Sequence, residues 1–272
     1  MTAAAIESHK LDIGRVLGGT FQVIGRNFLT FAILGLVLSG LPTGVIAFFQ
    51  ANWLSGQVDE LAAGNVNLGM SYFSNIGLVG LASLITTAIL QGALIYATVQ
   101  DMNGQKPQVG EALATGLRAF LPLIVVSILF TLAIAFGLIL LIVPGIMIAC
   151  AWCVAVPSLV ADRTGIFGAF SRSAELTRGN RWRVFGLFLV LFVILIVLSS
   201  VLGAVTMAAV FSDPNALENP FAAALNPVNI VVSVFQQTIT AVLGATLTAV
   251  LYVELRRARE GAGPQWLAEI FS

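Results

Sequence analysis

The chain has 272 residues, of which 58% are hydrophobic and only 10% are charged, and its mean hydropathy is +0.97. Soluble globular domains carry about 25% charged residues, so this chain has too few ionic side chains to cover a water-facing surface, and a soluble enzyme is excluded. The 13 Lys and Arg residues balance 13 Asp and Glu residues, which leaves no overall basic field for nucleic acid. The composition indicates an integral membrane protein.

Long runs without charge locate the membrane spans. A helix needs about 20 apolar residues to cross a hydrocarbon core of roughly 30 Å. The segments that lack Asp, Glu, Lys and Arg are 27–58, 61–100, 119–161, 184–212 and 219–253. The run 119–161 is long enough for two crossings, and Val143-Pro144-Gly145 supplies a turn. We therefore predict an all-α integral membrane protein with one membrane domain over 1–272 and six transmembrane helices, near 28–49, 75–100, 121–143, 145–161, 184–211 and 228–254.

Three amphipathic segments precede spans and predict interfacial helices at 11–26, 109–120 and 165–178. In the third, Ile166, Phe167, Phe170 and Ala174 group on one side of a helical wheel. Gly179 is a plausible stop for that helix.

The basic residues predict the orientation. With six spans, all 13 Lys and Arg fall on the side that carries both termini. The opposite segments, 50–74 and 212–227, hold only Asp59, Glu60, Asp213 and Glu218. By the positive-inside rule, both termini are cytoplasmic. The first apolar run begins after about 27 residues and is as long as a span, so we expect no cleavable signal.

The sequence lacks the motifs that are typical of catalytic sites. His9 is the single histidine, and the sequence has neither a Gly-rich phosphate loop with a following Lys nor an H-E-x-x-H pair. Cys150 and Cys153 form a C-x-x-C pair inside the fourth span. We interpret them as two small packing residues, and not as a redox or metal site. We predict that the chain is not an enzyme, has no catalytic residue, and holds no metal or cofactor.

A basic segment at the start of the fifth span is the best candidate binding surface. Arginine forks match phosphate oxygens, and tryptophan favours the headgroup layer. The candidate lipid-headgroup residues are Arg172, Arg178, Arg181, Trp182 and Arg183. The alternative is that these residues only anchor the topology.

A second candidate is a polar cavity between the second and sixth spans, lined by Gln91, Gln236 and Gln237. Ordinary hydrogen bonding between helices also explains such residues. Pro42 interrupts the first span, and interrupted helices often line substrate sites in transporters.

One stretch resembles a known family. The residues that carry the likeness are Ala151-Trp152, Pro157, Asp162, Gly165, Ala169-Phe170, Ser173, Leu176-Thr177, Gly179 and Trp182, with Tyr252 and Leu255-Arg256 in the last span. They resemble the membrane domain of bacterial glycerophosphoryl diester phosphodiesterases and its stand-alone relatives. The resemblance implies a six-helix bundle with interfacial helices. It implies no phosphodiesterase activity, because the catalytic part of that family is a separate soluble domain.

Together these observations predict a non-enzymatic, multi-pass protein of the bacterial inner membrane. We expect an accessory or scaffold that binds anionic lipid, another membrane-protein complex, or both, and that does not bind nucleic acid. The alternative is a transporter or lipid carrier with a polar site between spans two and six.

Overall fold

The computed structural model describes residues 11–62, 70–212 and 226–260, and every regular element in these ranges is a helix. Six segments are long and apolar enough to cross a membrane: Phe28–Gln50, Gly77–Met102, Val109–Leu140, Ile142–Asp162, Arg181–Phe211 and Pro227–Glu260. The predicted fold class, an all-helical membrane protein with six candidate spans, is confirmed.

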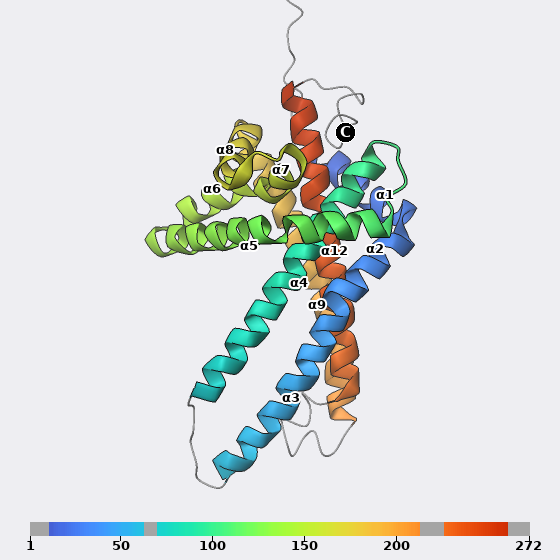
Figure 1. Cartoon of the computed structure of the whole chain (residues 1–272), viewed down its shortest axis with the longest axis vertical. Coiled ribbons are helices and arrows are strands. Elements are labelled where there is room, and N and C mark those ends of the chain that lie inside the picture. Colours follow the sequence, from blue (N-terminus) through green and yellow to red (C-terminus); the bar gives the residue numbers. More distant parts are fainter. Residues whose placement is uncertain (1–10, 63–69, 213–225, 261–272) are drawn as a thin grey trace, which may run out of the picture.

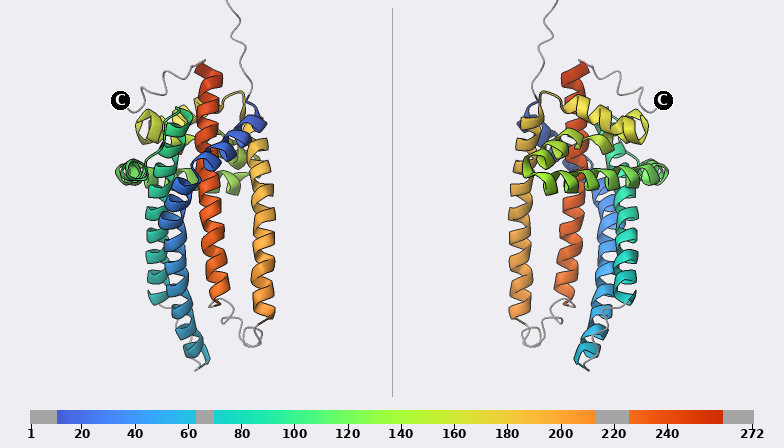
Figure 2. Two further views of the ribbon diagram at one scale, coloured as in Figure 1. Left: turned by 90° about the vertical axis from the view of Figure 1, so that its right-hand side faces the viewer. Right: turned by 90° about the vertical axis from the view of Figure 1, so that its left-hand side faces the viewer.

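The long helices run side by side along the long axis of the molecule (Figures 1 and 2). They are α2 (Phe28–Gly35), η1 (Leu36–Gly40) and α3 (Leu41–Ala62), which continue one another, with α4 (Met70–Met102), α9 (Arg181–Phe211) and α12 (Pro227–Glu260). Helix α12 contacts α1, η1, α4 and α9 and is the most buried of the candidate spans. The exposed face of α9 is apolar and rich in valine, as expected where lipid is the solvent.

The interruption predicted at Pro42 takes the form of a π-helical turn. Proline cannot donate a backbone hydrogen bond, and the turn over Leu36–Gly40 ends with the Leu41 N–H bonded to the Leu36 carbonyl. Such bulges absorb a local defect while the helix continues. A Cβ atom on Gly40 would lie 2.6 Å from Oγ1 of Thr238, so the turn is packed closely against α12.

Two of the predicted amphipathic helices are present at one end of the molecule (Figure 1). Helix α1 (Ile13–Arg26) begins after Asp12, whose carboxylate accepts a 3.2 Å hydrogen bond from the Arg15 N–H, and buries Val16 and Val23. Helix α8 (Gly165–Thr177) ends before Gly179, as predicted. Of the residues predicted to share its apolar side, Phe170 is buried and Phe167 is exposed, and the polar Ser173 is fully buried as well.

The third amphipathic segment, 109–120, is not a separate helix. It is the first part of α5 (Val109–Leu140), which continues through Pro122. The predicted boundary between 109–120 and a span at 121–143 is therefore wrong. A β-region backbone at Leu141 (φ −164°, ψ 143°) ends α5. This turn comes slightly before the predicted Val143-Pro144-Gly145, which lies in the first turn of the next helix.

The predicted span 145–161 is two helices. Helix α6 (Ile142–Trp152) stops at Cys153, and α7 (Ala155–Asp162) starts after Val154, whose backbone is not helical (φ −108°, ψ 19°). Helices α5 and α6 pack as a hairpin, and both figures show it running across the long helices near the end that carries α7 and α8 (Figures 1 and 2). The hairpin is tight at Gly137, where an added Cβ would lie 2.9 Å from Cα of Gly145.

The segments that carry the described Lys and Arg residues gather at the same end of the molecule (Figure 1). This end, which we call the basic end, comprises α1, the α4–α5 connection, the first half of α5, α7, α8, the start of α9 and the end of α12. Lys10, Asp213 and Glu218, which belong to the predicted charge partition, lie outside the described residues.

Candidate functional site

The connection from α8 to α9 positions the predicted lipid-binding residues. Gly179 adopts φ +87°, a left-handed conformation that suits glycine at a helix end. Asn180 precedes α9, but its side chain does not cap that helix, because its Oδ1 accepts a 3.3 Å hydrogen bond from the Leu11 N–H. Arg181 and Trp182 therefore open α9 at a helix N-terminus without a side-chain cap.

The five predicted headgroup residues do not form one cluster. Arg183 donates a 2.7 Å hydrogen bond from Nη1 to the Leu11 carbonyl, which joins α9 to the start of α1. Arg178 is exposed, and its carbonyl accepts a hydrogen bond from Arg259. Arg172 lies apart from both, in a network of carboxylates described below. The structure therefore leaves Arg181 and Trp182 as the pair beside a cavity.

That cavity is an apolar groove between α6 and α9, with a volume of about 340 Å³. We call it the α6–α9 groove. Its lining is Val143, Ile146, Met147 and Cys150 from α6, Gly179 from the connection, and Arg181, Trp182 and Phe185 from α9. Its size falls at the lower end of small-molecule sites, which are mostly apolar with a few polar groups that fix orientation.

Arg181 supplies the polar group of the groove. Its Nε is buried and has no hydrogen-bond partner within the part of the chain that the structure describes. A buried donor without a partner costs about 1–3 kcal/mol, and more when the group is charged. Trp182 beside it is 85% exposed and packs its ring edge-to-face on Phe185, with centroids 6.1 Å apart. The α6–α9 groove is therefore an apolar hollow lined by one cation that has an unused hydrogen-bond donor.

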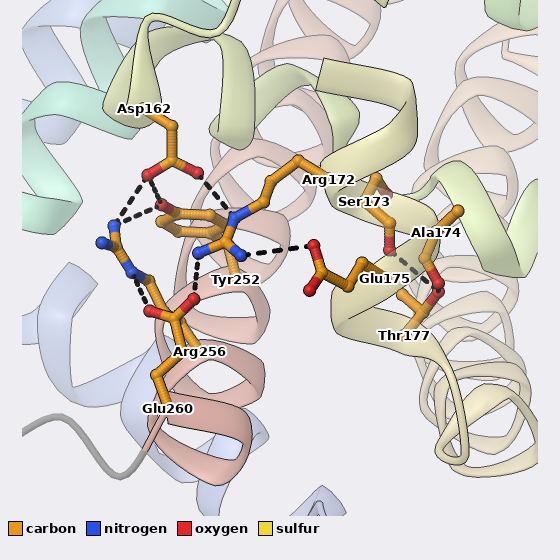
Figure 3. A network of polar contacts seen from close by, with 9 residues as sticks. All are labelled: Asp162, Arg172, Ser173, Ala174, Glu175, Thr177, Tyr252, Arg256 and Glu260. Atoms are coloured by element: carbon orange, nitrogen blue, oxygen red, sulfur yellow. Dashed lines mark hydrogen bonds and ion pairs between the residues drawn. The ribbon is translucent and has the colours of Figure 1, made fainter. Parts of the chain in front are cut away.

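A second polar feature, which the sequence interpretation missed, is an ion-pair network among α7, α8 and α12 (Figure 3). Asp162 at the end of α7 accepts hydrogen bonds from Tyr252 (2.8 Å) and Arg256 (2.7 Å), and its other oxygen pairs with Arg172 at 3.3 Å. Glu260 binds both Arg172 and Arg256. We call these five residues the Asp162 network.

The Asp162 network occupies the guanidinium of Arg172. Burial by itself lowers the pKa of Arg172, but the Glu260 and Asp162 carboxylates outweigh it and raise the pKa above the ordinary value. A third carboxylate, Glu175, lies 3.5 Å away. Arg172 is thus permanently charged and already surrounded by acids, which makes it a poor partner for an anionic headgroup.

The resemblance residues have a structural explanation in the same region. Ser173 of α8 donates a 2.9 Å hydrogen bond to the Ala151 carbonyl and accepts a 3.2 Å one from the Val154 N–H. Thr177 also donates to Ala151, at 3.1 Å. These bonds satisfy backbone groups that the α6–α7 break leaves without helical partners. Trp152 packs on Phe170 of α8, with the two rings tilted by 53° and their centroids 4.7 Å apart.

The three glutamines of the predicted polar cavity are divided between two cavities. Gln91 and Gln237 line one cavity of about 400 Å³ between α4, α5 and α12. The Gln91 Oε1 is buried and accepts no hydrogen bond from the described residues. Gln236 faces a different hollow, of about 710 Å³, where it donates a 3.1 Å hydrogen bond to Ser199 of α9. Gln237 and Thr240 line both cavities.

Among the described residues, no three or more His, Cys, Asp or Glu side chains cluster in a way that could hold a metal ion. Cys150 and Cys153 are free thiols, and the Cys153 Sγ donates to the Cys150 carbonyl at 3.3 Å. Glu254, at the end of α12, pairs with Arg257 at 2.8 Å and with Arg15 at 3.7 Å.

Comparison with known proteins identifies bacterial membrane relatives. A UPF0259 membrane protein of Pectobacterium carotovorum subsp. carotovorum (strain PC1) is 25% identical over 178 residues, which cover 57% of this chain and 70% of that protein. UPF0259 membrane proteins of Yersinia pestis (strain Pestoides F) and Yersinia pseudotuberculosis (serotype O:1b) are 30% identical over 99 residues, 36% of this chain and 39% of each relative. The match thus spans well under half the length of the Yersinia proteins.

These matches support a bacterial family of membrane proteins, and they give no link to glycerophosphoryl diester phosphodiesterases. No solved structure matches the chain. A family model described as "Domain of unknown function (DUF7847)" matches residues 11–255, nearly the whole described chain, so the protein belongs to that family.

Proposed function

We propose that this chain is a non-enzymatic, multi-pass protein of the bacterial inner membrane that binds an anionic phospholipid in the α6–α9 groove. In this proposal the protein serves as an accessory or scaffold for another membrane complex. The observation that carries the lipid site is that Arg181, which lines an apolar groove, has a buried Nε without a partner among the described residues. A phosphate oxygen is the acceptor that a guanidinium binds best.

The electrostatics of the α9 N-terminus support an anion at this place. A helix N-terminus carries a partial positive charge and unpaired N–H groups, which favour anions. Here the terminus has no side-chain cap, and arginines at positions 181 and 183 add to the positive charge. Arg183 donates a hydrogen bond to the Leu11 carbonyl, but a carbonyl is neutral and leaves the positive charge of Arg183 unbalanced. A headgroup phosphate would supply the missing negative charge.

The apolar part of the groove supports an acyl chain as the rest of the ligand. Val143, Ile146 and Met147 line it from α6, and Phe185 lines it from α9. Trp182 is mostly exposed, as interfacial tryptophans are at the level of lipid headgroups. A phosphate site next to an apolar groove matches the headgroup and the acyl chain of a phospholipid. A soluble phosphate compound would leave the apolar part of the groove unfilled.

The sidedness belongs to the same proposal. The positive-inside rule favours the basic end in the cytoplasm, and the cytoplasmic leaflet carries anionic lipids that attract basic segments by about 1 kcal/mol per residue. The likeness of residues 151–182 to the membrane domain of glycerophosphoryl diester phosphodiesterases remains an expectation. It implies the bundle and its interfacial helices and no activity of that enzyme.

The test compares two single arginine substitutions. Arg181→Gln removes the cation from the groove, and Arg15→Gln removes a charge from the same end of the molecule, where Arg15 is 64% exposed. Hydrogen bonds to charged groups are worth about 1.5–3 kcal/mol, so we expect Arg181→Gln to weaken phosphatidylglycerol binding about tenfold or more in native mass spectrometry. Arg15→Gln should leave it within about twofold. Equal losses in the two variants would mean that the arginines act only as general topology anchors.

A lipid or solute carrier is the second candidate, and the buried, unpaired Gln91 Oε1 in the cavity shared with Gln237 favours it. Thr240 lines both cavities of this region. In a carrier, a cysteine at Thr240 should react with a small, water-soluble thiol reagent in membrane vesicles. A Thr240→Cys variant, made with Cys150 and Cys153 replaced by alanine, that stays unreactive until the membrane is dissolved would argue against transport.

A further inference from the structure

The α5–α6 hairpin raises a question that length and hydropathy leave open. Val109–Leu140 and Ile142–Asp162 are each long and apolar enough to cross a bilayer. These two properties do not set the direction of a helix. In both ribbon views the hairpin runs across α4, α9 and α12 instead of along them (Figures 1 and 2).

Helix α6 is too short to cross by itself. Its 11 residues extend about 16 Å at 1.5 Å per residue, about half of a 30 Å hydrocarbon core. The second candidate span reaches 21 residues only by adding α7 beyond the break at Cys153 and Val154. Ser173 binds both backbone sides of that break and is fully buried, so the change of direction is built into the fold.

The tip of the hairpin is suited to hydrocarbon and not to water. Residues 137–145 read Gly-Leu-Ile-Leu-Leu-Ile-Val-Pro-Gly, without one polar side chain. Ile139 is 81% exposed, and its neighbours through Val143 are exposed as well. Two backbone hydrogen bonds close the turn, from the Leu141 N–H to the Gly137 carbonyl and from the Gly145 N–H to the Leu141 carbonyl. The exposed surface of the tip is therefore formed by apolar side chains.

Both ends of the hairpin are held at the basic end. The start of α5 packs on the second half of α4, where a Cβ on Gly116 would lie 2.3 Å from the Ile89 carbonyl oxygen. The end of α6 is fixed to α8 through Trp152 and Phe170. The hairpin is thus anchored at both ends beside the arginines, and it runs across the long helices. Its tip therefore lies at the same depth in the membrane as its base.

We propose that the α5–α6 hairpin does not cross the bilayer but lies within the leaflet at the basic end, with its exposed face in contact with the acyl chains of that leaflet. The crossings are then made by α2–η1–α3, α4, α9 and α12. Removing two crossings keeps their number even, so both termini and all the basic segments stay on one side. This inference is independent of lipid binding at Arg181, which concerns the groove and not the depth of α5.

Spin-label depth measurements test the inference. Residues Leu132 and Leu140 on α5 are both exposed and eight positions apart, as are Val193 and Val201 on α9. Eight helical residues span about 12 Å along the axis. Each position receives a nitroxide in turn, and its depth is measured in phosphatidylethanolamine–phosphatidylglycerol vesicles from the relative relaxation by oxygen and by a water-soluble nickel complex. Cysteines for labelling are introduced with Cys150 and Cys153 replaced by alanine.

We expect the α9 pair to differ in depth by about 12 Å, and the α5 pair to differ by less than half as much. A depth difference for the α5 pair of half the α9 value or more would overturn the proposal. The α9 pair also reports whether the cysteine-free background is folded. If it is not, a genetically encoded nitroxide at the same four positions in the unaltered chain gives the same comparison.

Discussion

The Asp162 network offers the sharpest test of how the basic end is held together. Asp162→Asn keeps the shape of the side chain and an oxygen that can accept from Tyr252, but it removes the negative charge between Arg172 and Arg256. The Asp162 side chain is only 11% exposed, and those of the two arginines are 20% and 17% exposed. Both guanidiniums would then share Glu260, and the new amide group would face them with its N–H donors.

The magnitude follows from these exposures. Removing one partner of a fully buried ion pair costs about 3–5 kcal/mol, whereas exposed pairs contribute about 0–1 kcal/mol. The network is mostly but not fully buried, so we expect Asp162→Asn to lower the free energy of unfolding by about 2–3 kcal/mol. Because Asp162 joins α7 to α8 and α12, the loss should appear in the stability of the whole basic end.

The assay is reversible unfolding in mixed micelles by titration with sodium dodecyl sulfate, followed by tryptophan fluorescence. Trp152 is a suitable reporter because it packs on Phe170 of α8. Arg15→Gln serves as the control, since its 3.7 Å pair with Glu254 is exposed on the arginine side. A loss below 1 kcal/mol for Asp162→Asn, no larger than that of the control, would refute the assigned role of the network.

Four further substitutions follow from the packing. Ser173→Ala removes both hydrogen bonds to the backbone of the α6–α7 break, including the one to Ala151, and should cost about 1–3 kcal/mol in the same unfolding assay. Gly116→Ala should destabilise by about 1–3 kcal/mol because its Cβ meets the α4 backbone, whereas Gly18→Ala, with nothing within 4 Å, should be neutral or stabilising by up to about 1 kcal/mol. Trp182→Ala should change stability by less than about 0.5 kcal/mol, because its ring is mostly exposed, yet it should reduce retention of phosphatidylglycerol in native mass spectrometry.

Hydropathy predicted most of the fold, because the bilayer imposes simple demands on length and charge. The bounds of α9 and α12 lie within a few residues of the predicted spans, except for the charged last turns of α12. The amphipathic pattern located α1 and α8. The direction of α5 relative to the other long helices could not be predicted from hydropathy. A helix that is apolar on all sides has the same composition whether it crosses the membrane or lies within one leaflet.

The candidate site was predicted only in part. Arginines near a span entrance are recognisable from sequence, but which of them has a free donor depends on tertiary partners. Arg172 and Arg181 look alike in the sequence, and only the fold places Asp162 and Glu260 beside the first. The Asp162 network was missed because Asp162 and Arg256 are 94 positions apart. A signal was present, since Asp162 and Arg256 are both among the residues that carried the family resemblance.

The most direct test of the central claim, an anionic lipid in the α6–α9 groove, is photocrosslinking in native membranes from two matched methionine positions. Met147 lines the groove, and Met207 lies on α9 near its far end, outside it; both are about half exposed. With a diazirine amino acid at each position, we predict that adducts at 147 are enriched in phosphatidylglycerol or cardiolipin over the bulk membrane, while adducts at 207 match the bulk composition. The same lipid composition at both positions would contradict the account.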